Sequence, residues 1–306
     1  MRTVRHPGEL RWETRLLGVI TATMVVFGIV AVYAASPVTE GANSGQFYAL
    51  RQLVGATLGG ILLIAASRVD YYRWRQLAWP FLLITILLLL VAVLPFTEGI
   101  APTIKGARRW LRVGPFSVQP SEVARLAVII WCAMLATKKG IQVREFKKGV
   151  MPFVVVLGTV FGLVLLQPNM SMATLIVLLG GVVLFTAGAR IGHFAMLAGI
   201  GILIAIKGIE SAPYRLARVK AFLGMGEELG SRYQVMQAKI GFGAGGAFGV
   251  GLGEGQQKIF LPEGESDFIF SSIGEEWGFA GACLVIALFS AFCWLGFRIA
   301  RTASDP

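Results

Sequence analysis

The sequence has 306 residues, of which 56% are hydrophobic and only 15% are charged, and its net charge is +11. Soluble domains carry about a quarter charged residues, so this composition excludes an ordinary soluble protein and indicates a membrane protein. Much of the positive charge falls in short loops between apolar runs, as orientation in a membrane requires, so we expect no nucleic-acid partner.

Apolar runs long enough to cross roughly 30 Å of hydrocarbon recur along the chain. We therefore predict an all-α polytopic membrane protein with about eight transmembrane helices and a large extracytoplasmic loop before the last one. The first run is too long for the core of a signal peptide, so we expect an uncleaved helix. The predicted spans are 16–35, 53–67, 77–94, 121–136, 153–166, 172–189, 194–209 and 268–297.

Basic residues indicate how these helices are oriented. Lys and Arg gather after the second, fourth, sixth and last spans, whereas residues 36–47 contain neither. Because cytoplasmic loops are enriched in Lys and Arg, both termini are predicted to lie in the cytoplasm.

Two outer loops depart from this pattern, and we expect function there. Residues 98–120 are basic on the outer side, and residues 210–266 form a long extracytoplasmic loop with expected interfacial structure. The glycine-rich stretch 242–255 follows no predicted strand, which argues against a dinucleotide or phosphate-binding loop. It indicates either flexibility near the lipid surface or close backbone packing.

The first of these loops contains a cluster of basic side chains beside Trp110. Clustered guanidinium and ammonium groups bind phosphate oxygens well. A solvated face, or contact with lipid headgroups, would explain the same residues. The cluster consists of Lys105, Arg108, Arg109 and Arg112.

The motif QPSE follows this cluster. Pro120 and Ser121 are typical of a helix start, and Glu122 falls in the first turn, where the helix dipole favours an anion. Glu122 and Arg125 have the i,i+3 spacing of a pair, and such a pair within a span is expected to face a polar cavity. Helix capping alone would also account for Glu122.

Gln167, Pro168 and Asn169 lie between two apolar runs with almost no loop between them. Pro and Asn are common turn residues, so a tight outer turn is one explanation. A polar contribution of Gln167 and Asn169 to a binding site is the other.

The segment 253–278, GEGQQKIFLPEGESDFIFSSIGEEWG, contains six carboxylates, and five of them gather around the hydrophobic run FIF at the membrane edge. Ionisable groups there are costly and therefore indicate function. Glu263 and Glu265 belong to the loop before the last span. The other three carboxylates are Asp267, Glu275 and Glu276.

A helix beginning near Asp267 would place a polar stripe on one face, suited to lining a cleft. Asp267 at the outer mouth would then be a general base, or alternatively an ordinary N-cap. The stripe consists of Asp267, Ser271, Gly274, Glu275 and Gly278.

These motifs together resemble the SEDS family (shape, elongation, division and sporulation), which includes RodA, FtsW and SpoVE. The resemblance rests on GARRW…QPSE, the QPN turn, and the run from the glycine-rich stretch through QK, LPE and DFIF to IGEE, over essentially the whole chain. GARRW and the QK before LPE favour the FtsW branch.

The resemblance implies a ten-helix fold that polymerises lipid II into peptidoglycan strands and releases polyprenyl pyrophosphate. The implied catalytic residue is Asp267. Glu122 corresponds to the glutamate of the family's QPSE motif, and Arg125 corresponds to a basic residue three positions later that is usually lysine. Expected substrate-binding residues are Lys105, Arg108, Arg109, Glu122, Arg125, Gln167, Asn169, Glu263 and Glu275. The implied partners are a class B penicillin-binding protein, which is a transpeptidase, and other divisome or elongasome membrane proteins of the bacterial cytoplasmic membrane.

The chain departs from the family pattern at three places. Asn169 replaces a usual Asp, and Gly264 and Glu265 replace Ala-His in the PExxxD motif. The chain also stops at Pro306, where the family continues for two helices and an SYGGSS end, so residues 1–306 are expected to be one C-terminally incomplete membrane domain.

Two other functions fit the same residues. A flippase for the same lipid would use the basic loop and polar cleft without a base, and a non-catalytic division scaffold would need neither. The three cysteines and two histidines show no metal-ligand spacing, so we assign no metal ligands, and the sequence leaves open whether a divalent cation assists.

Overall fold

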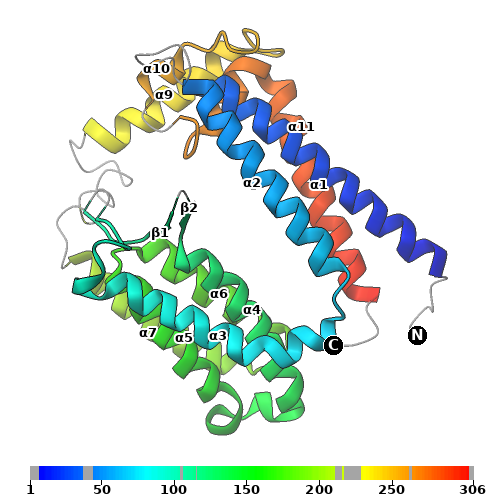
Figure 1. The fold of residues 1–306 in the computed structure, drawn as a ribbon, viewed down its shortest axis with the longest axis vertical. Helices are drawn as coiled ribbons and strands as arrows, with labels where there is room; N and C mark the ends of the chain where they lie inside the picture. The colour runs from blue at the N-terminus through cyan, green and yellow to red at the C-terminus, as the bar shows by residue number, and fades with distance from the viewer. Residues whose placement is uncertain are drawn as a thin grey trace. The chain divides into compact units, whose positions relative to one another are not determined.

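The computed structural model of the chain describes residues 7–36, 44–103, 106–114, 116–210, 229–261 and 264–302, together with Leu216. The chain divides into two compact units. Unit 1 comprises Met1–Ala65 and Ile209–Pro306, and unit 2 comprises Ala66–Gly208. The elements are labelled in Figure 1.

Each predicted apolar run falls on a helix, and the all-α membrane fold is confirmed. Seven helical segments of the described residues are long and apolar enough to cross a membrane: α1 (Pro7–Ala35), α2 (Ser44–Ser67), α3 (Tyr71–Val93), α4 (Pro120–Lys139), α5 (Met151–Leu166) together with the helical turn before it (a span of 20 residues, Phe146–Leu165), α7 (Ile191–Glu210) and α11 (Ile269–Thr302). The shorter α6 (Met170–Thr186) has 17 residues, which corresponds to about 26 Å of helix.

Unit 2 is a helical bundle in which α4 packs against α3 and α6, and α5 packs against α6. Trp131 of α4 is at its centre, with ring centroids 5.3 Å from Trp79 and 5.7 Å from Phe153. Ala124 and Val128 lie along the same helix and are fully buried. Small residues let neighbouring helices approach closely, which is how membrane helices gain packing energy.

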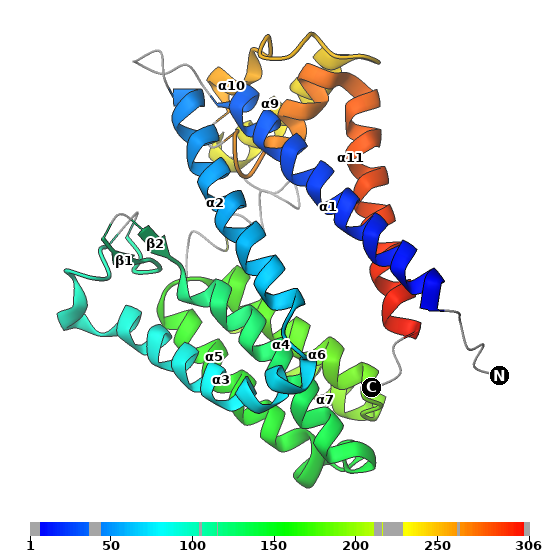
Figure 2. The same ribbon diagram turned by 45° about the vertical axis from the view of Figure 1, so that its right-hand side comes forward.

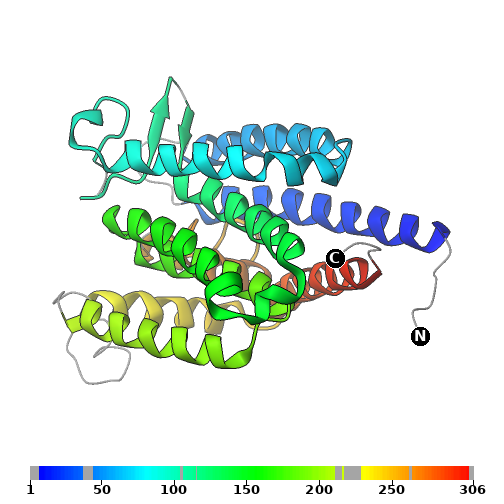
Figure 3. The same ribbon diagram turned by 90° about the horizontal axis from the view of Figure 1, so that it is seen from below.

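A small β-hairpin is an addition to the all-α prediction. Strands β1 (Leu111–Val113) and β2 (Phe116–Val118) pair antiparallel, with Arg112 opposite Ser117. Gly114 at the turn has φ 61°, a conformation that glycine adopts readily. The hairpin lies at the N-terminal end of α4 (Figure 3). Short helical turns complete the unit: η1 (Pro95–Thr97), η2 (Gly140–Arg144) and η3 (Phe146–Val150).

In unit 1, α1 and α11 lie side by side (Figures 1 and 2). At one end, Arg298 forms an ion pair with the buried Glu13. At the other, the rings of Phe27 and Trp277 meet edge to face at 5.1 Å. The two helices are therefore fixed in register by contacts near both ends.

The segment 210–266 contains more helix than the sequence analysis expected. The helix α9 (Leu229–Gly245) packs against α11, and the short α10 (Gln257–Phe260) follows the glycine-rich stretch. Ser271 Oγ of α11 donates to the carbonyl oxygen of Ala238 at 2.7 Å. A described part of this expected loop is thus an ordered helix packed on the last span.

The glycine-rich stretch makes close backbone contact with α11, which is one of the two alternatives that the sequence left open. Gly278 has φ 65° and ψ −165°, so the regular helix is interrupted there. Phe279 and Ala280 donate their amide hydrogens to Gly246 and Ala247 of the stretch, at 2.9 and 3.0 Å. An uninterrupted helix would send these two hydrogen bonds to the carbonyls of Glu275 and Glu276.

The two carbonyls released by this interruption are also used. Val250 donates to the carbonyl oxygen of Glu275 at 3.0 Å, and Gly251 donates to that of Glu276 at 3.2 Å. The stretch therefore replaces both missing helical hydrogen bonds with four intersegment ones. The two backbones can approach this closely only where the residue is glycine, because a Cβ on Gly249 would lie 2.1 Å from the Glu276 carbonyl oxygen.

This packing makes Gly245 sensitive to substitution and Gly243 insensitive. A Cβ at Gly245 would lie 2.0 Å from the carbonyl oxygen of Gly274, whereas one at Gly243 meets nothing within 4 Å. We expect Gly245→Ala to lower the free energy of unfolding by about 1–3 kcal/mol, the usual cost of overpacking. Gly243→Ala in the same helix should stabilise the chain by about 0.5–1 kcal/mol.

Thermal unfolding of both variants in one detergent checks this prediction. Equal midpoints for Gly245→Ala and Gly243→Ala would contradict close packing between α9 and α11.

Candidate functional site

The predicted site residues are distributed over both units. Asp267 and Glu275 belong to unit 1. Unit 2 carries Arg108, Arg109, Glu122, Arg125, Gln167 and Asn169. Lys105 and Glu263 lie outside the described residues. That the two sets form one site stays a prediction.

Asp267 lies in the turn before α11 and not within the helix, because the helix begins at Ile269. Its side chain is exposed and has no hydrogen-bond or ion-pair partner among the described residues. The N-cap explanation therefore has no hydrogen bond to support it. A continuous helical face from Asp267 to Gly278, as expected from the sequence, is wrong at both ends.

The stripe within α11 is packed against protein. Ser271, Gly274, Glu275 and Gly278 are buried, and a Cβ on Gly274 would lie 2.3 Å from the ring of Phe242 in α9. This differs from the expected cleft lining, because α9 and the glycine-rich stretch cover that face. The structure therefore separates the exposed Asp267 from the buried residues that follow it.

Glu275 is 3% exposed, and its carboxylate accepts backbone hydrogen bonds. Oε1 accepts from the amides of Gln256 at 2.8 Å and Gln257 at 3.2 Å, and Oε2 accepts from Gln257 at 3.2 Å. The expected role of Glu275 in substrate binding stays a prediction. In this structure its oxygens hold the first turn of α10.

Lys258, a residue of the QK motif, is a largely buried cation, with a side chain that is 10% exposed. Its Nζ donates to the carbonyl oxygens of Ala34 at 3.0 Å and Gly253 at 2.5 Å. It also lies 3.5 Å from Oε1 of the buried Glu276. A buried charge needs a counter-ion and hydrogen bonds, and Lys258 has both. It thereby joins α10 to the end of α1 and to α11.

The side chain of Arg108 binds groups of the loop between α3 and β1. Its guanidinium forms an ion pair with Glu98 and donates to the carbonyl oxygens of Leu94 and Pro95, each at 3.2 Å. Its Nε donates to Thr103 Oγ1 at 3.2 Å. The side chain was predicted to bind an anionic substrate, but its donors here order the loop.

Arg109 connects the basic loop to the QPN turn. Its Nε donates to the carbonyl oxygen of Gln167 at 3.1 Å, and its Nη2 donates to that of Pro168. Gln167 is fully buried and donates through Nε2 to the carbonyl oxygen of Leu89 at 3.2 Å. Asn169 is the N-cap of α6 and accepts from the amide of Met172 at 3.4 Å.

The QPN segment is therefore a turn, as one alternative proposed, and the basic loop holds it in place. This long-range connection between Arg109 and the turn had no signal in the sequence.

The Glu122–Arg125 pair is present as its spacing predicted. Arg125 Nη2 forms an ion pair with Glu122 Oε2 in the first turn of α4. The side chains of Glu122 and Arg125 are 42% and 41% exposed, so both are partly accessible at the protein surface. Arg112, in the hairpin, is exposed, and its backbone amide donates to the carbonyl oxygen of Ile100 at 2.8 Å. Its guanidinium has no partner among the described residues, which distinguishes it from those of Arg108 and Arg109.

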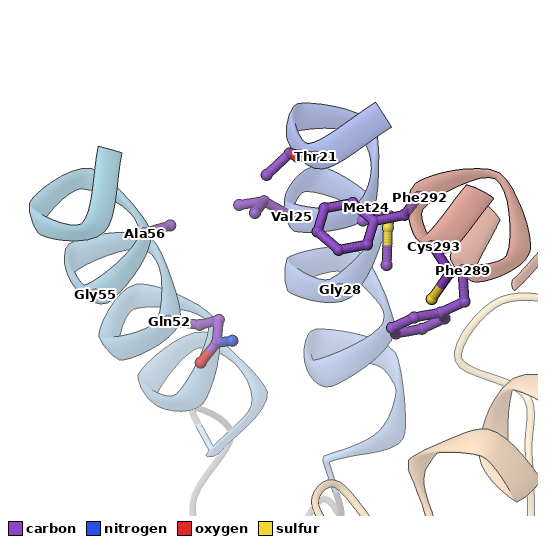
Figure 4. A pocket seen from close by; sticks show the side chains of 10 residues that line it. All are labelled: Thr21, Met24, Val25, Gly28, Gln52, Gly55, Ala56, Phe289, Phe292 and Cys293. Atoms are coloured by element: carbon purple, nitrogen blue, oxygen red, sulfur yellow. The ribbon is translucent and has the colours of Figure 1, made fainter. Parts of the chain in front are cut away.

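An apolar groove of about 900 Å³ lies between α1, α2 and α11 of unit 1 (Figure 4). Its lining is apolar apart from Thr21 and Gln52, and Thr21 Oγ1 donates to the Leu17 carbonyl of its own helix. The groove contains no carboxylate, so it offers no general base. Among the described residues, no group of three or more His, Cys, Asp or Glu side chains is arranged to hold a metal ion.

The sequence model of the FtsW, RodA and SpoVE family of cell cycle proteins matches residues 14–306. The chain belongs to this family. The SEDS resemblance predicted from its motifs is confirmed.

Curated relatives match this chain over nearly its whole length. The probable peptidoglycan glycosyltransferase FtsW of Trichlorobacter lovleyi is 37% identical over 309 residues, which cover all of this chain and 80% of that protein. Stage V sporulation protein E of Bacillus subtilis is 38% identical over 294 residues, covering 95% of this chain and 80% of that protein.

Solved structures share the fold of this SEDS chain. One, from a peptidoglycan synthase complex studied for the coordination of polymerization and crosslinking, has a TM-score of 0.68 at 26% identity, covering 90% of this chain and 74% of that one. The rod shape determining protein RodA of Thermus thermophilus has a TM-score of 0.58 at 25% identity, covering 92% of this chain and 72% of that one.

Arg109 is expected to stabilise the QPN turn of this SEDS chain. Arg109→Ala removes two hydrogen bonds from a charged donor and should lower the free energy of unfolding by about 1–3 kcal/mol. Arg112→Ala, which removes an exposed side chain from the same loop, should change it by less than about 0.5 kcal/mol.

Thermal unfolding midpoints of the two variants, measured side by side in detergent, check this difference. A loss as large for Arg112→Ala as for Arg109→Ala would contradict the assignment.

Proposed function

We propose that this multi-pass membrane protein is a peptidoglycan glycosyltransferase that adds disaccharide units from lipid II to a glycan strand. The observation that carries the proposal is the contrast among the carboxylates after Ser266. Asp267 is exposed and unpartnered among the described residues, whereas Glu275 and Glu276 are buried and engaged. The curated relatives named as probable peptidoglycan glycosyltransferases support the reaction class.

In the proposed reaction, the carboxylate of Asp267 takes the proton from the 4-hydroxyl of the acceptor sugar. That oxygen forms a bond to the anomeric carbon of the lipid-linked donor as the bond to the diphosphate breaks, with inversion. The electron pair of the broken bond leaves with polyprenyl pyrophosphate. A positioned general base typically contributes about 10²–10⁴-fold to such a step.

The leaving diphosphate needs cationic groups that are free to approach it. Arg108 and Arg109 already donate to the chain's own carbonyl groups, and we assign them to ordering the basic loop around the diphosphate. Arg112 has an exposed guanidinium and is the better candidate for direct contact. Lys105 is proposed for the same role, and Glu122 with Arg125 is proposed to line the sugar path with Gln167 and Asn169.

The membrane setting and the partner follow from the same proposal. The distribution of Lys and Arg supports an N-terminus in the cytoplasm of a bacterial cell and an outer face for α9, α10 and Asp267. The structural likeness to a chain of a peptidoglycan synthase complex supports a class B penicillin-binding protein as partner, with other division or elongation proteins around it.

Asp267→Asn removes the proposed base while keeping nearly the same shape. We expect the rate of lipid II polymerisation by the purified protein to fall by about 10²–10⁴-fold. Because Asp267 is exposed and makes no hydrogen bond or ion pair among the described residues, expression and the thermal unfolding midpoint should stay unchanged. The product is measured by gel separation of labelled glycan strands.

Glu254→Gln is the matched control, since Glu254 is an exposed carboxylate in the same outer segment. It should leave polymerisation unchanged. A near-native rate for Asp267→Asn would reject the base assignment. Translocation of lipid II across vesicles by the wild-type chain, without polymer, would favour a flippase, and partner binding without either activity would favour a scaffold.

A further inference from the structure

The loop that carries Asp267 is fastened by the side chain of Glu275. The carboxylate of Glu275 accepts a hydrogen bond from the backbone amide of Gln256, 19 positions earlier in the chain, at 2.8 Å. Residues 257–274, which include Asp267, are therefore enclosed between two joined points. Asp267 makes no recorded hydrogen bond of its own among the described residues, so its position depends on how this loop is held.

The base of the loop is built to receive the carboxylate. A Cβ on Gly255 would lie 3.1 Å from Glu275 Oε2 and 3.1 Å from Glu276 Cγ, so a glycine leaves room for both acidic side chains. The backbone carbonyl of Glu275 is itself held by Val250 at 3.0 Å. Both the main chain and the side chain of this residue are thus fixed to the segment that precedes α10.

Two further contacts hold the loop between its base and Asp267. Lys258 bonds the carbonyl oxygen of Ala34 at 3.0 Å and faces Glu276, which ties α10 to α1 and α11. Ser272 Oγ donates to the carbonyl oxygen of Gly264 at 3.4 Å. Both contacts involve buried residues of α11, whereas Asp267 stays exposed on the turn.

We propose that Glu275 is a positioning residue for glycosyl transfer, which acts by holding the Gln256–Glu275 loop so that Asp267 meets the acceptor hydroxyl. The inference rests on the proposed function, in which Asp267 is the base. It differs from the expected role of Glu275 as a substrate-binding residue, because both carboxylate oxygens already accept backbone amides. Small misplacement of a reacting group is costly, with about 10²-fold lost for a 1 Å shift.

The test compares Glu275→Ala and Glu275→Gln in the full chain, reconstituted in lipid nanodiscs. kcat and KM for lipid II are measured together with amide hydrogen exchange of peptides covering 256–268. Asp70→Ala is the matched control, because Asp70 accepts a backbone amide from Tyr72 at 3.1 Å in unit 2. That variant removes a similar cap and should leave kcat, KM and exchange in 256–268 unchanged.

We expect Glu275→Ala to lower kcat by about 10²-fold with KM little changed, and to speed exchange at 256–268. Glu275→Gln keeps an acceptor oxygen that reaches both amides, so it should recover most of the lost kcat and most of the protection. Should Glu275→Ala fail to accumulate in the membrane, Glu275→Asp replaces it, since the shorter side chain withdraws the acceptors without removing the carboxylate.

Three results would overturn the inference. A raised KM with normal kcat would make Glu275 a binding residue, and a Glu275→Gln variant as slow as Glu275→Ala would show that its charge matters and not its hydrogen bonds. A lower kcat without faster exchange would exclude loop fastening. An inactive wild-type chain would instead reject the proposed function, and exchange at 256–268 would then decide alone whether Glu275 holds the loop.

Discussion

The exchange of backbone hydrogen bonds at Gly278 is the constraint on which the outer part of unit 1 depends. A helix that breaks in the membrane must satisfy the freed amides and carbonyls within the protein, because lipid offers no partners. Here Phe279 and Ala280 donate to the glycine-rich stretch, and the carbonyls of Glu275 and Glu276 accept from it. Only glycines bring two backbones so close, so the break in α11 accounts for the glycines at Gly245 and Gly249.

This docking also decides the state of each acidic side chain near the outer end of α11. Burying a carboxylate is expensive unless it is hydrogen-bonded or paired. Glu275 receives backbone amides and Glu276 faces Lys258, so both are held inside the unit. Asp267 precedes the helix and keeps its exposure. Asp267 therefore differs in exposure from Glu275 and Glu276, because the backbone places it before the helix and places them against α10 and Lys258.

The sequence was sufficient for the spans, because apolar length alone predicts a transmembrane helix, and for the Glu122–Arg125 pair, because helical spacing is local. It was insufficient where a contact joins distant segments. The partners of Arg109 lie 58 and 59 positions away, and no local pattern encodes such a pairing. The hairpin was missed although Gly114-Pro115 between Val113 and Phe116 is a turn signal. The helical stripe from Asp267 failed because periodicity assumed a regular helix through Gly278.

Asn169, which stands where the SEDS resemblance implies an aspartate, is the N-cap of α6. Asn and Asp are nearly equivalent as N-caps, since each presents a side-chain oxygen to the amides of the first turn. Asn169 makes this bond to Met172, so the exchange of an acid for an amide leaves the turn and the helix start as they were. An aspartate at this position would add one negative charge to the turn whose Gln167 and Pro168 carbonyls Arg109 binds. Exchanging the two residues would therefore alter the local electric field while keeping the cap.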